Sequence, residues 1–154
     1  MKMWPFKKKS LYLSEDEKAL IAKAIGEAEM QTSGEIRVYV EGKCKSDDPL
    51  KRACDLFAQL AMFATKEHNG VLVYVAVKDR KLAIYGDSGI HARVGDDFWN
   101  EAVGKMVQIY KNQNTIAAGI INVVKEIGCA LKQHFPYDKE NDVNELPDDI
   151  IVNK

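Results

Sequence analysis

A nearly unbroken apolar run from Val71 to Val77 constrains the fold of this chain more than any other feature. Because such a run has no polar face, both of its faces must be covered by other parts of the protein. The run lies within the longer stretch Asn69 to His91, which predicts two strands joined by a tight turn at 78–80. The second strand is expected at 81–85, and a glycine-bracketed polar loop at 86–89 follows it.

Four helices are predicted around these strands. The first begins at Ser14, which opens a capping-box pattern. The second begins with Asp48 as N-cap and Pro49 at the first helical position, where a missing N–H group has no cost. A third is expected to begin with Asp96 as N-cap, and a fourth, long and strongly apolar, spans about 115–134.

The order of these elements predicts the topology of the sheet. A strand at 35–41, the second helix and the Val71 strand form a β-α-β unit, whose two strands are expected to be parallel. The strand at 81–85 then returns antiparallel, so the sheet is mixed. The chain is therefore predicted to be an α/β protein, a three-layer α/β/α sandwich with a small mixed sheet and about four helices.

The length and the charge distribution predict one domain with two charged ends. A chain of 154 residues suits a single domain. The first ten residues carry four lysines and no acid, whereas acids dominate after Phe135. We expect a basic N-terminal segment at 1–13, an α/β domain at 14–135 and an acidic flexible tail at 136–154. Such ends are usually solvated, and contact with a protein partner through them is the alternative.

Composition narrows the class of protein. The net charge of −1 argues against a dedicated nucleic-acid binder, which normally carries a basic excess. The sequence has neither a signal-peptide pattern nor a stretch of about 18 apolar residues for membrane insertion. The three cysteines are odd in number and widely spaced, which favours free thiols in a reducing compartment. A cytoplasmic location is expected.

The strong phosphate and metal motifs are absent from the sequence, including the Walker, dinucleotide-binding and EF-hand patterns. Gly86-Asp87-Ser88-Gly89 superficially resembles the nucleophile loop of trypsin-like proteases, but the chain is rich in helices and lacks their β-barrel pattern. The glycines are instead expected to let the chain turn sharply off a strand. The three histidines have no ligand spacing and are expected at the surface or at helix ends.

One group of loop acids indicates a candidate cation site. Asp87, Asp96 and Asp97 lie within eleven positions and flank a short turn expected at 90–94. Hard cations such as Ca²⁺ and Mg²⁺ require several oxygen atoms that converge from loops. The alternative is that Asp96 is only an N-cap and that Asp97 complements the helix dipole. Both interpretations remain open at this point.

A second candidate site lies at the hairpin turn. Asp79 and Arg80 are expected at an exposed turn, yet ligands of open α/β sheets bind outside the carboxyl ends of parallel strands. Glu41 at the end of the first strand, and Asp47 and Asp48 of the loop after it, would share that edge of the sheet. Asp87 is expected at the opposite edge. One compact site is therefore not expected to use both groups.

Several segments, in their order along the chain, carry a resemblance to a known family. They are a capped helix, a Ser-Gly-Glu-Ile strand, the run Asn-Gly-Val-Leu-Val-Tyr-Val-Ala-Val, the pair Asp79-Arg80, and Ile-Tyr-Gly-x-x-Gly-Ile. Together they resemble the TPM domain family, over about Ser14 to Phe135. The resemblance implies an α/β/α sandwich, divalent-cation binding, notably of calcium, and acid phosphatase activity as in some plant members.

The chain departs from the family pattern at several places. Most relatives have a signal peptide and often a C-terminal membrane segment or glycine-rich tail, which are missing from this sequence. The glycine-bracketed loop at 86–89 is one residue longer than the usual glycine-x-glycine loop of the family. His91 stands where an acid is common. The pair Asp96-Asp97 falls where the family often has a threonine-aspartate step.

Two functions follow from the residues and the resemblance. The first is a binding or accessory module that holds Ca²⁺ or Mg²⁺ through loop carboxylates, the candidate ligands being Asp79, Asp87, Asp96 and Asp97. The second is a metal-assisted acid phosphatase acting on phosphomonoesters. In that case Arg80 would clamp the phosphate and an aspartate such as Asp79 would act as nucleophile or base. A third interpretation is an interaction protein that uses the charged ends.

Overall fold

A computed structural model describes residues 12–113, 115–137 and 150–152 of the chain. The described residues form a four-stranded sheet in the order β3-β2-β1-β4. The strands are β1 (Glu35–Glu41), β2 (Gly70–Ala76), β3 (Lys81–Gly86) and β4 (Ile150–Val152). The helices are α1 (Glu15–Glu29), α2 (Pro49–Gln59), α3 (Ser88–Gln113) and α4 (Ile116–His134), with a short 3₁₀ helix, η2 (Met62–Ala64), after α2.

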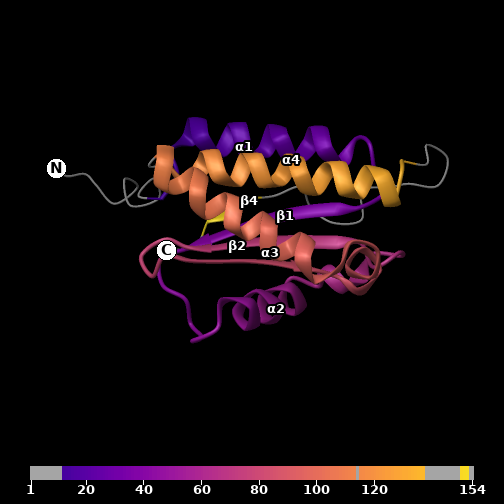
Figure 1. The fold of residues 1–154 in the computed structure, drawn as a ribbon, viewed down its shortest axis with the longest axis horizontal. Helices are drawn as coiled ribbons and strands as arrows, with labels where there is room; N and C mark the ends of the chain where they lie inside the picture. The colour runs from indigo at the N-terminus through magenta and orange to yellow at the C-terminus, as the bar shows by residue number, and fades with distance from the viewer. Residues whose placement is uncertain (1–11, 114, 138–149, 153–154) are drawn as a thin grey trace.

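The helices cover both faces of the sheet. Figure 1 shows α1 and α4 side by side above the sheet and α2 beneath it. Helix α3 lies beside α4 and runs along the β3 side of the sheet. The predicted three-layer α/β/α arrangement is therefore confirmed. None of the helices in the described ranges combines the length and the apolarity that a membrane crossing requires.

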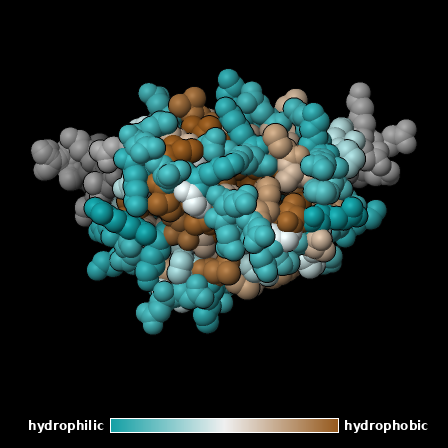
Figure 2. All heavy atoms as spheres, in the orientation of Figure 1, coloured by the Kyte–Doolittle hydropathy of each residue, from teal (hydrophilic) through white to brown (hydrophobic). Residues whose placement is uncertain are grey.

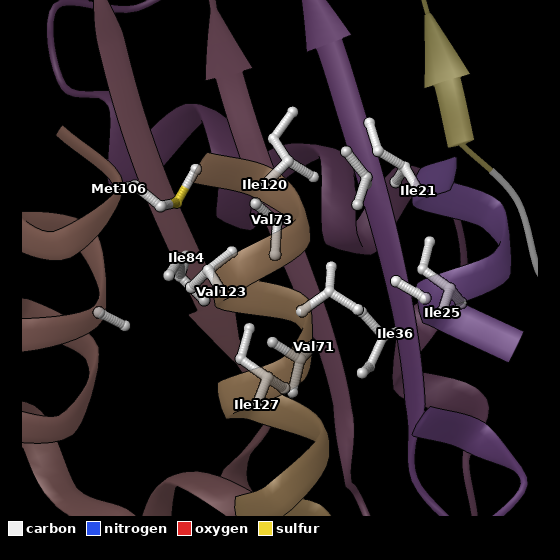
Figure 3. Close-up of a cluster of buried hydrophobic side chains, with 14 of the residues drawn as sticks. Ile21, Ile25, Ile36, Val71, Val73, Ile84, Met106, Ile120, Val123 and Ile127 are labelled. Carbon is white, nitrogen blue, oxygen red and sulfur yellow. The ribbon is translucent and has the colours of Figure 1, made fainter. Parts of the chain in front are cut away.

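Strand β2, which contains most of the apolar run from Val71 to Val77, contributes to two hydrophobic clusters, one on each face of the sheet. Every residue of β2 is buried. The larger cluster fills the space between the sheet and the layer of α1, α3 and α4, and Figure 3 shows residues of all three strands β1 to β3 meeting those helices. The smaller cluster packs Leu72 and Tyr74 of β2 against Phe57 of α2. Both faces of β2 are covered, as its sequence requires.

Local sequence signals position most of the elements correctly. The Ser14 side chain accepts a hydrogen bond from the Glu17 N–H group in a full capping box. Asp48 caps α2, accepting from Leu50 N at 2.9 Å, and Pro49 is the first residue of that helix. Strand β1 pairs parallel with β2, and β3 pairs antiparallel with β2. The predicted β-α-β unit and the mixed sheet are both confirmed.

The fourth strand is a feature that the sequence did not predict. Residues 150–152 fall in the segment expected to be an acidic flexible tail, but they pair parallel with Val38–Val40 of β1. The three apolar residues Ile150, Ile151 and Val152 form a strand that is too short to give a periodicity signal in the sequence. The rest of that tail, 138–149 and 153–154, and residues 1–11 of the basic segment lie outside the described residues.

Helix α3 also begins earlier than predicted. Residues 90–94, expected to form a turn, are helical, and α3 starts at Ser88. The helix is interrupted at Gly95, which has φ 78° and ψ 174°. A glycine adopts such a positive φ without steric cost, so it ends one helical segment and allows the next to begin. The predicted start at Asp96 therefore corresponds to the second segment of α3.

Candidate functional site

A groove of about 890 Å³ runs along β3, and we call it the β3 groove. Residues 82–86 of β3 form its floor. One wall comes from α3 and the other from the start of α2 and from η2, the wall residues being Trp99, Asn100 and Val103 on α3 and Pro49, Leu50 and Phe63 opposite. Figure 2 shows the face that carries α3, where apolar side chains reach the surface among polar ones.

The groove ends in a polar group built around Trp99. A Cβ atom placed on Gly86 would lie 2.3 Å from Cζ2 of Trp99, so the indole rests directly on the backbone of β3. The Trp99 indole N–H donates to Nδ1 of His91 at 3.0 Å. Because an indole nitrogen only donates, the neutral His91 ring carries its hydrogen on Nε2. That atom lies 3.5 Å from Oδ1 of Asp96.

Asp87 lies at the same end of the groove and is 3% exposed. One carboxylate oxygen accepts the Ser88 N–H group at 2.7 Å, and the other lies 3.2 Å from Nδ1 of His68. Its backbone N–H donates to Gly70 of β2, and its carbonyl accepts from His91. Asp87 therefore joins the end of β3 to the start of α3, and its carboxylate already has two polar neighbours.

The loop that resembles a protease nucleophile loop has a structural explanation. A Cβ atom on Gly89 would lie 2.1 Å from the carbonyl oxygen of Glu67, so only glycine fits there. The Gly89 N–H group donates to the carbonyl of His68 at 2.8 Å. Within the described ranges, the Ser88 hydroxyl has no hydrogen bond to a histidine. Neither Gly86 nor Gly89 has a positive φ, so these glycines permit close packing and do not supply the special turn conformation that was expected.

Asp79 and Arg80 lie at the opposite end of β3. The carboxylate of Asp79 accepts the Cys44 N–H group at 2.7 Å, which joins the hairpin turn to the loop after β1. Lys81 Nζ lies 3.2 Å from the carbonyl oxygen of Asp47, a second link between the two segments. We call residues 42–48 and 77–81 the carboxyl rim. Arg80 is exposed and has φ 54°.

The carboxyl rim carries more positive than negative charge. Its five basic residues are Lys43, Lys45, Lys78, Arg80 and Lys81, and its three acidic residues are Asp47, Asp48 and Asp79. A cluster of charges of one sign raises the local concentration of ions of the opposite sign. This surface therefore attracts anions in preference to cations.

Glu41, expected at the carboxyl rim, is instead held in the protein interior. Its carboxylate accepts two hydrogen bonds from Arg52, at 2.9 and 3.1 Å, and a third from the Tyr74 hydroxyl. Burial alone would raise the pKa of Glu41, but the hydrogen bonds from Arg52 and Tyr74 and the charge of Arg52 outweigh it and lower that pKa. Burial, followed by the bond to Glu41, raises the pKa of Tyr74. The carboxylate of Glu41 is not available to a ligand.

The structure thus divides the four predicted metal ligands between two places. Asp79 lies at the carboxyl rim, whereas Asp87 and Asp96 both line the far end of the β3 groove. Asp97 follows Asp96 and is exposed. Strand β3 separates the two places by its six residues, about 20 Å at 3.3 Å per residue. No group of three or more His, Cys, Asp or Glu side chains that could hold a metal ion occurs among the described residues.

Comparison with known proteins identifies the family. The TPM domain model matches residues 7–130 of the chain. Among solved structures, BA42 from the psychrophilic bacterium Bizionia argentinensis is 40% identical, with a TM-score of 0.83 over 94% of this chain and 97% of that one. No curated protein matches the chain.

Two further solved structures share the fold at low sequence identity. The N-terminal domain of a P. gingivalis protein is 17% identical, with a TM-score of 0.67 over 85% of each chain. The N-terminal domain of cg2496 from Corynebacterium glutamicum is 15% identical, with a TM-score of 0.61 over 77% of this chain and 74% of that one. The family model and the 40% identical relative confirm the resemblance noted in the sequence. The chain belongs to the TPM domain family.

Proposed function

We propose that this TPM domain is a binding or accessory module that takes a divalent cation, Ca²⁺ or Mg²⁺, at the end of the β3 groove. The observation that carries the proposal is that Asp87 and Asp96 line the same end of one groove. The Asp96 side chain is 86% exposed, and Asp97 beside it is also exposed. Two aspartates with solvent access and a third behind them are suitable oxygen ligands for a hard cation.

The residues present fit a cation that keeps much of its water. A complete cage is absent from the described residues, as stated above. Mg²⁺ usually keeps several waters and uses one or two carboxylates, and Ca²⁺ accepts water among its six to eight oxygens. Asp96 and Asp97 would be the ligands, with Asp87 as a nearby negative charge. Binding to so few protein oxygens is expected to be weak.

Addition of calcium to the metal-free protein is expected to shift backbone amide NMR signals near Asp96 and Asp97, with smaller shifts near Asp79. The reason is that the carboxyl rim around Asp79 carries five basic residues against three acidic ones. An Asp96→Asn variant should lose the response, and the matched variant Asp79→Asn should keep it. Unchanged spectra at millimolar calcium, or shifts that depend on Asp79, would contradict this cation site.

A metal-assisted phosphatase is the second candidate, and one observation favours it. The basic carboxyl rim, with Arg80 exposed at its turn, would attract a phosphate group. The mechanism requires the cation and the phosphate clamp to contact the same phosphoryl group. Asp79 and Arg80 lie at the other end of β3 from Asp87 and Asp96, so the two halves of such a site are separated. We therefore rank the binding module first.

Assays with a phosphomonoester such as p-nitrophenyl phosphate, with millimolar magnesium or calcium, are expected to give equal rates for the wild type and Asp79→Ala. Asp79 is expected to have a structural role only, because its carboxylate already accepts the Cys44 N–H group. A rate that falls about a hundredfold or more in Asp79→Ala, as for loss of a group that acts in the reaction, would restore the phosphatase hypothesis.

Two further expectations belong to the same proposal. The ends expected to contact a protein partner, 1–13 and 136–154, lie mostly outside the described residues, so contact through them stays a prediction. The three cysteines are all free thiols, which supports the expected reducing, cytoplasmic location.

A further inference from the structure

In the part of the chain that the structure describes, strand β3 leaves one edge of the sheet open inside a groove. It is the outermost strand on its side of the sheet, next to β2 alone among the described strands. An outer strand presents a row of backbone N–H and C=O groups that can pair with another chain. Whether those groups are available depends on which residues of β3 point away from β2.

The register identifies the outward residues. Val77 donates its N–H group to Glu41 of β1, whereas Gly70 accepts a hydrogen bond from Asp87 at the end of β3. Residues along β2 therefore alternate, the odd-numbered ones facing β1 and the even-numbered ones facing β3. The partners of the even-numbered residues on β3 are 81, 83 and 85. The backbone groups of Leu82, Ile84 and Gly86 consequently point outward, and within the described ranges they have no hydrogen-bond partner.

Natural proteins usually protect such an edge with charge, proline or a bulge. The middle of β3, Leu82 to Tyr85, carries neither charge nor proline. It is recessed between α3 on one side and α2 with η2 on the other. A recessed edge admits a single extended chain, while the walls hinder the approach of a second folded sheet. This geometry favours a peptide segment over a second copy of the protein.

The walls and the ends of the groove specify the chemistry of that segment. Leu50 and Phe63, on one wall, are 50% and 40% exposed, which is unusual for large apolar residues in this structure. They offer contacts to apolar side chains of an added strand. The acids Asp87 and Asp96 lie at one end, and Lys81 begins β3 at the other. A segment with a basic end over the acids and an acidic end near Lys81 complements both.

We propose that the β3 groove binds an extended peptide segment of a partner protein by antiparallel strand addition to β3. The amino end of the segment is basic and lies over Asp87 and Asp96, its acidic carboxyl end lies near Lys81, and alternate side chains between them are apolar. Outward N–H and C=O groups of Leu82, Ile84 and Gly86 supply the hydrogen bonds. This binding does not require the proposed cation, which would compete with the basic end of the segment for Asp87 and Asp96, so it is tested in the presence of EDTA.

The test uses the full-length protein and a defined probe. The probe is an eight-residue blocked peptide in which valine alternates with threonine, with two lysines at its amino end and two glutamates at its carboxyl end. Binding is followed by backbone amide NMR and by amide hydrogen exchange. We expect shifts at 82–86 and at the Trp99 indole N–H, together with slower exchange of the Leu82, Ile84 and Gly86 amides, because those N–H groups become hydrogen-bonded.

Two matched peptides separate strand pairing from simple apolar contact. N-methylation of alternate amides removes several hydrogen-bond donors of the peptide, and we expect binding to weaken about tenfold or more. Exchange of the lysines and glutamates between the two ends keeps the composition and should also weaken binding. Equal binding of either control peptide, or an absence of shifts at 82–86 at millimolar probe, would overturn the proposal.

Protein variants complete the test. Leu82→Pro removes an outward N–H group without removing a bond to β2, a change that outer strands tolerate. Leu50→Ser alters an exposed wall residue, and Leu20→Ser, at 55% exposure on α1, is its control outside the groove. We expect the first two to weaken binding and the third to leave it unchanged. A dimer of the unliganded protein in sedimentation that Leu82→Pro dissociates would overturn the proposal in favour of self-pairing.

Discussion

Replacement of Arg52 by methionine is expected to lower the free energy of unfolding by about 3–5 kcal/mol, because it leaves a buried carboxylate without its charged partner. Glu41 is 2% exposed and accepts both of its ion-pair hydrogen bonds from Arg52. The Tyr74 hydroxyl would remain as a single neutral donor. Urea unfolding followed by circular dichroism measures the loss.

Two controls distinguish a buried charge from lost packing. In the double variant Glu41→Gln/Arg52→Met the new amide oxygen still accepts from Tyr74, and we expect much of the stability to return. Lys51 precedes Arg52 and forms an exposed ion pair with Asp55. We expect Lys51→Met to change the free energy of unfolding by less than about 1 kcal/mol. A loss for Arg52→Met no larger than that for Lys51→Met would contradict the expected role of the ion pair.

The same carboxylate predicts a dependence of stability on pH. The pKa of Glu41 is lower in the folded protein than its ordinary value of 4.5. A lowered pKa means that the unfolded chain binds the proton first, so the contribution of Glu41 is present above pH 4.5 and is lost as the pH falls through the folded pKa. We expect the stability difference between the wild type and Glu41→Gln to shrink in that acidic range. A difference that is constant from neutral pH to about pH 3 would contradict this linkage.

Substitution of Gly89 by alanine is expected to destabilise the protein by about 3 kcal/mol or more, the upper range for an atom forced into a packed site. Its Cβ atom would lie 2.1 Å from the Glu67 carbonyl oxygen and 2.6 Å from that of His68. Both atoms belong to the backbone, so they do not move aside as a flexible side chain does. The start of α3 would have to move away from the turn that carries His68, and the end of the β3 groove would change with it.

Gly104 provides the matched control for this prediction. It lies within α3, and a Cβ atom there would meet nothing within 4 Å. Alanine is the better helix former, so Gly104→Ala is expected to stabilise the protein by about 0.5–1 kcal/mol. Thermal unfolding of the two variants measures both effects. A Gly89→Ala variant as stable as the wild type would contradict the close approach described for this loop.

The sequence predicted the elements whose signals are local. The capping box at Ser14 and the Asp48-Pro49 pair fix two helix starts within a few residues, and the apolar run from Val71 requires cover on both faces. Strand β4 was missed because its stability comes from pairing with β1, more than 100 residues earlier in the chain. The helix start at Ser88 was missed because residues 90–94 were taken as a turn ahead of an N-cap at Asp96.

The candidate site was harder to predict because it depends on three-dimensional contacts. The sequence correctly placed Asp79 and Asp87 at opposite ends of one strand. The sequence analysis did not predict the ion pair between Glu41 and Arg52. The position of Arg52 among the buried residues of α2 is the signal that could have indicated it. The groove itself arises because α3 and η2 flank β3, the outermost described strand on its side of the sheet. One of its contacts joins Trp99 to Gly86, two residues that are more than ten positions apart in the sequence.

A crystal structure of the protein soaked in millimolar calcium chloride tests most directly where this TPM domain acts. We expect a calcium ion bound by Asp96 with Asp97 and water at the end of the β3 groove, near the buried carboxylate of Asp87. A calcium ion bound instead by Asp79 at the carboxyl rim would contradict the proposed site and would return attention to the opposite end of β3.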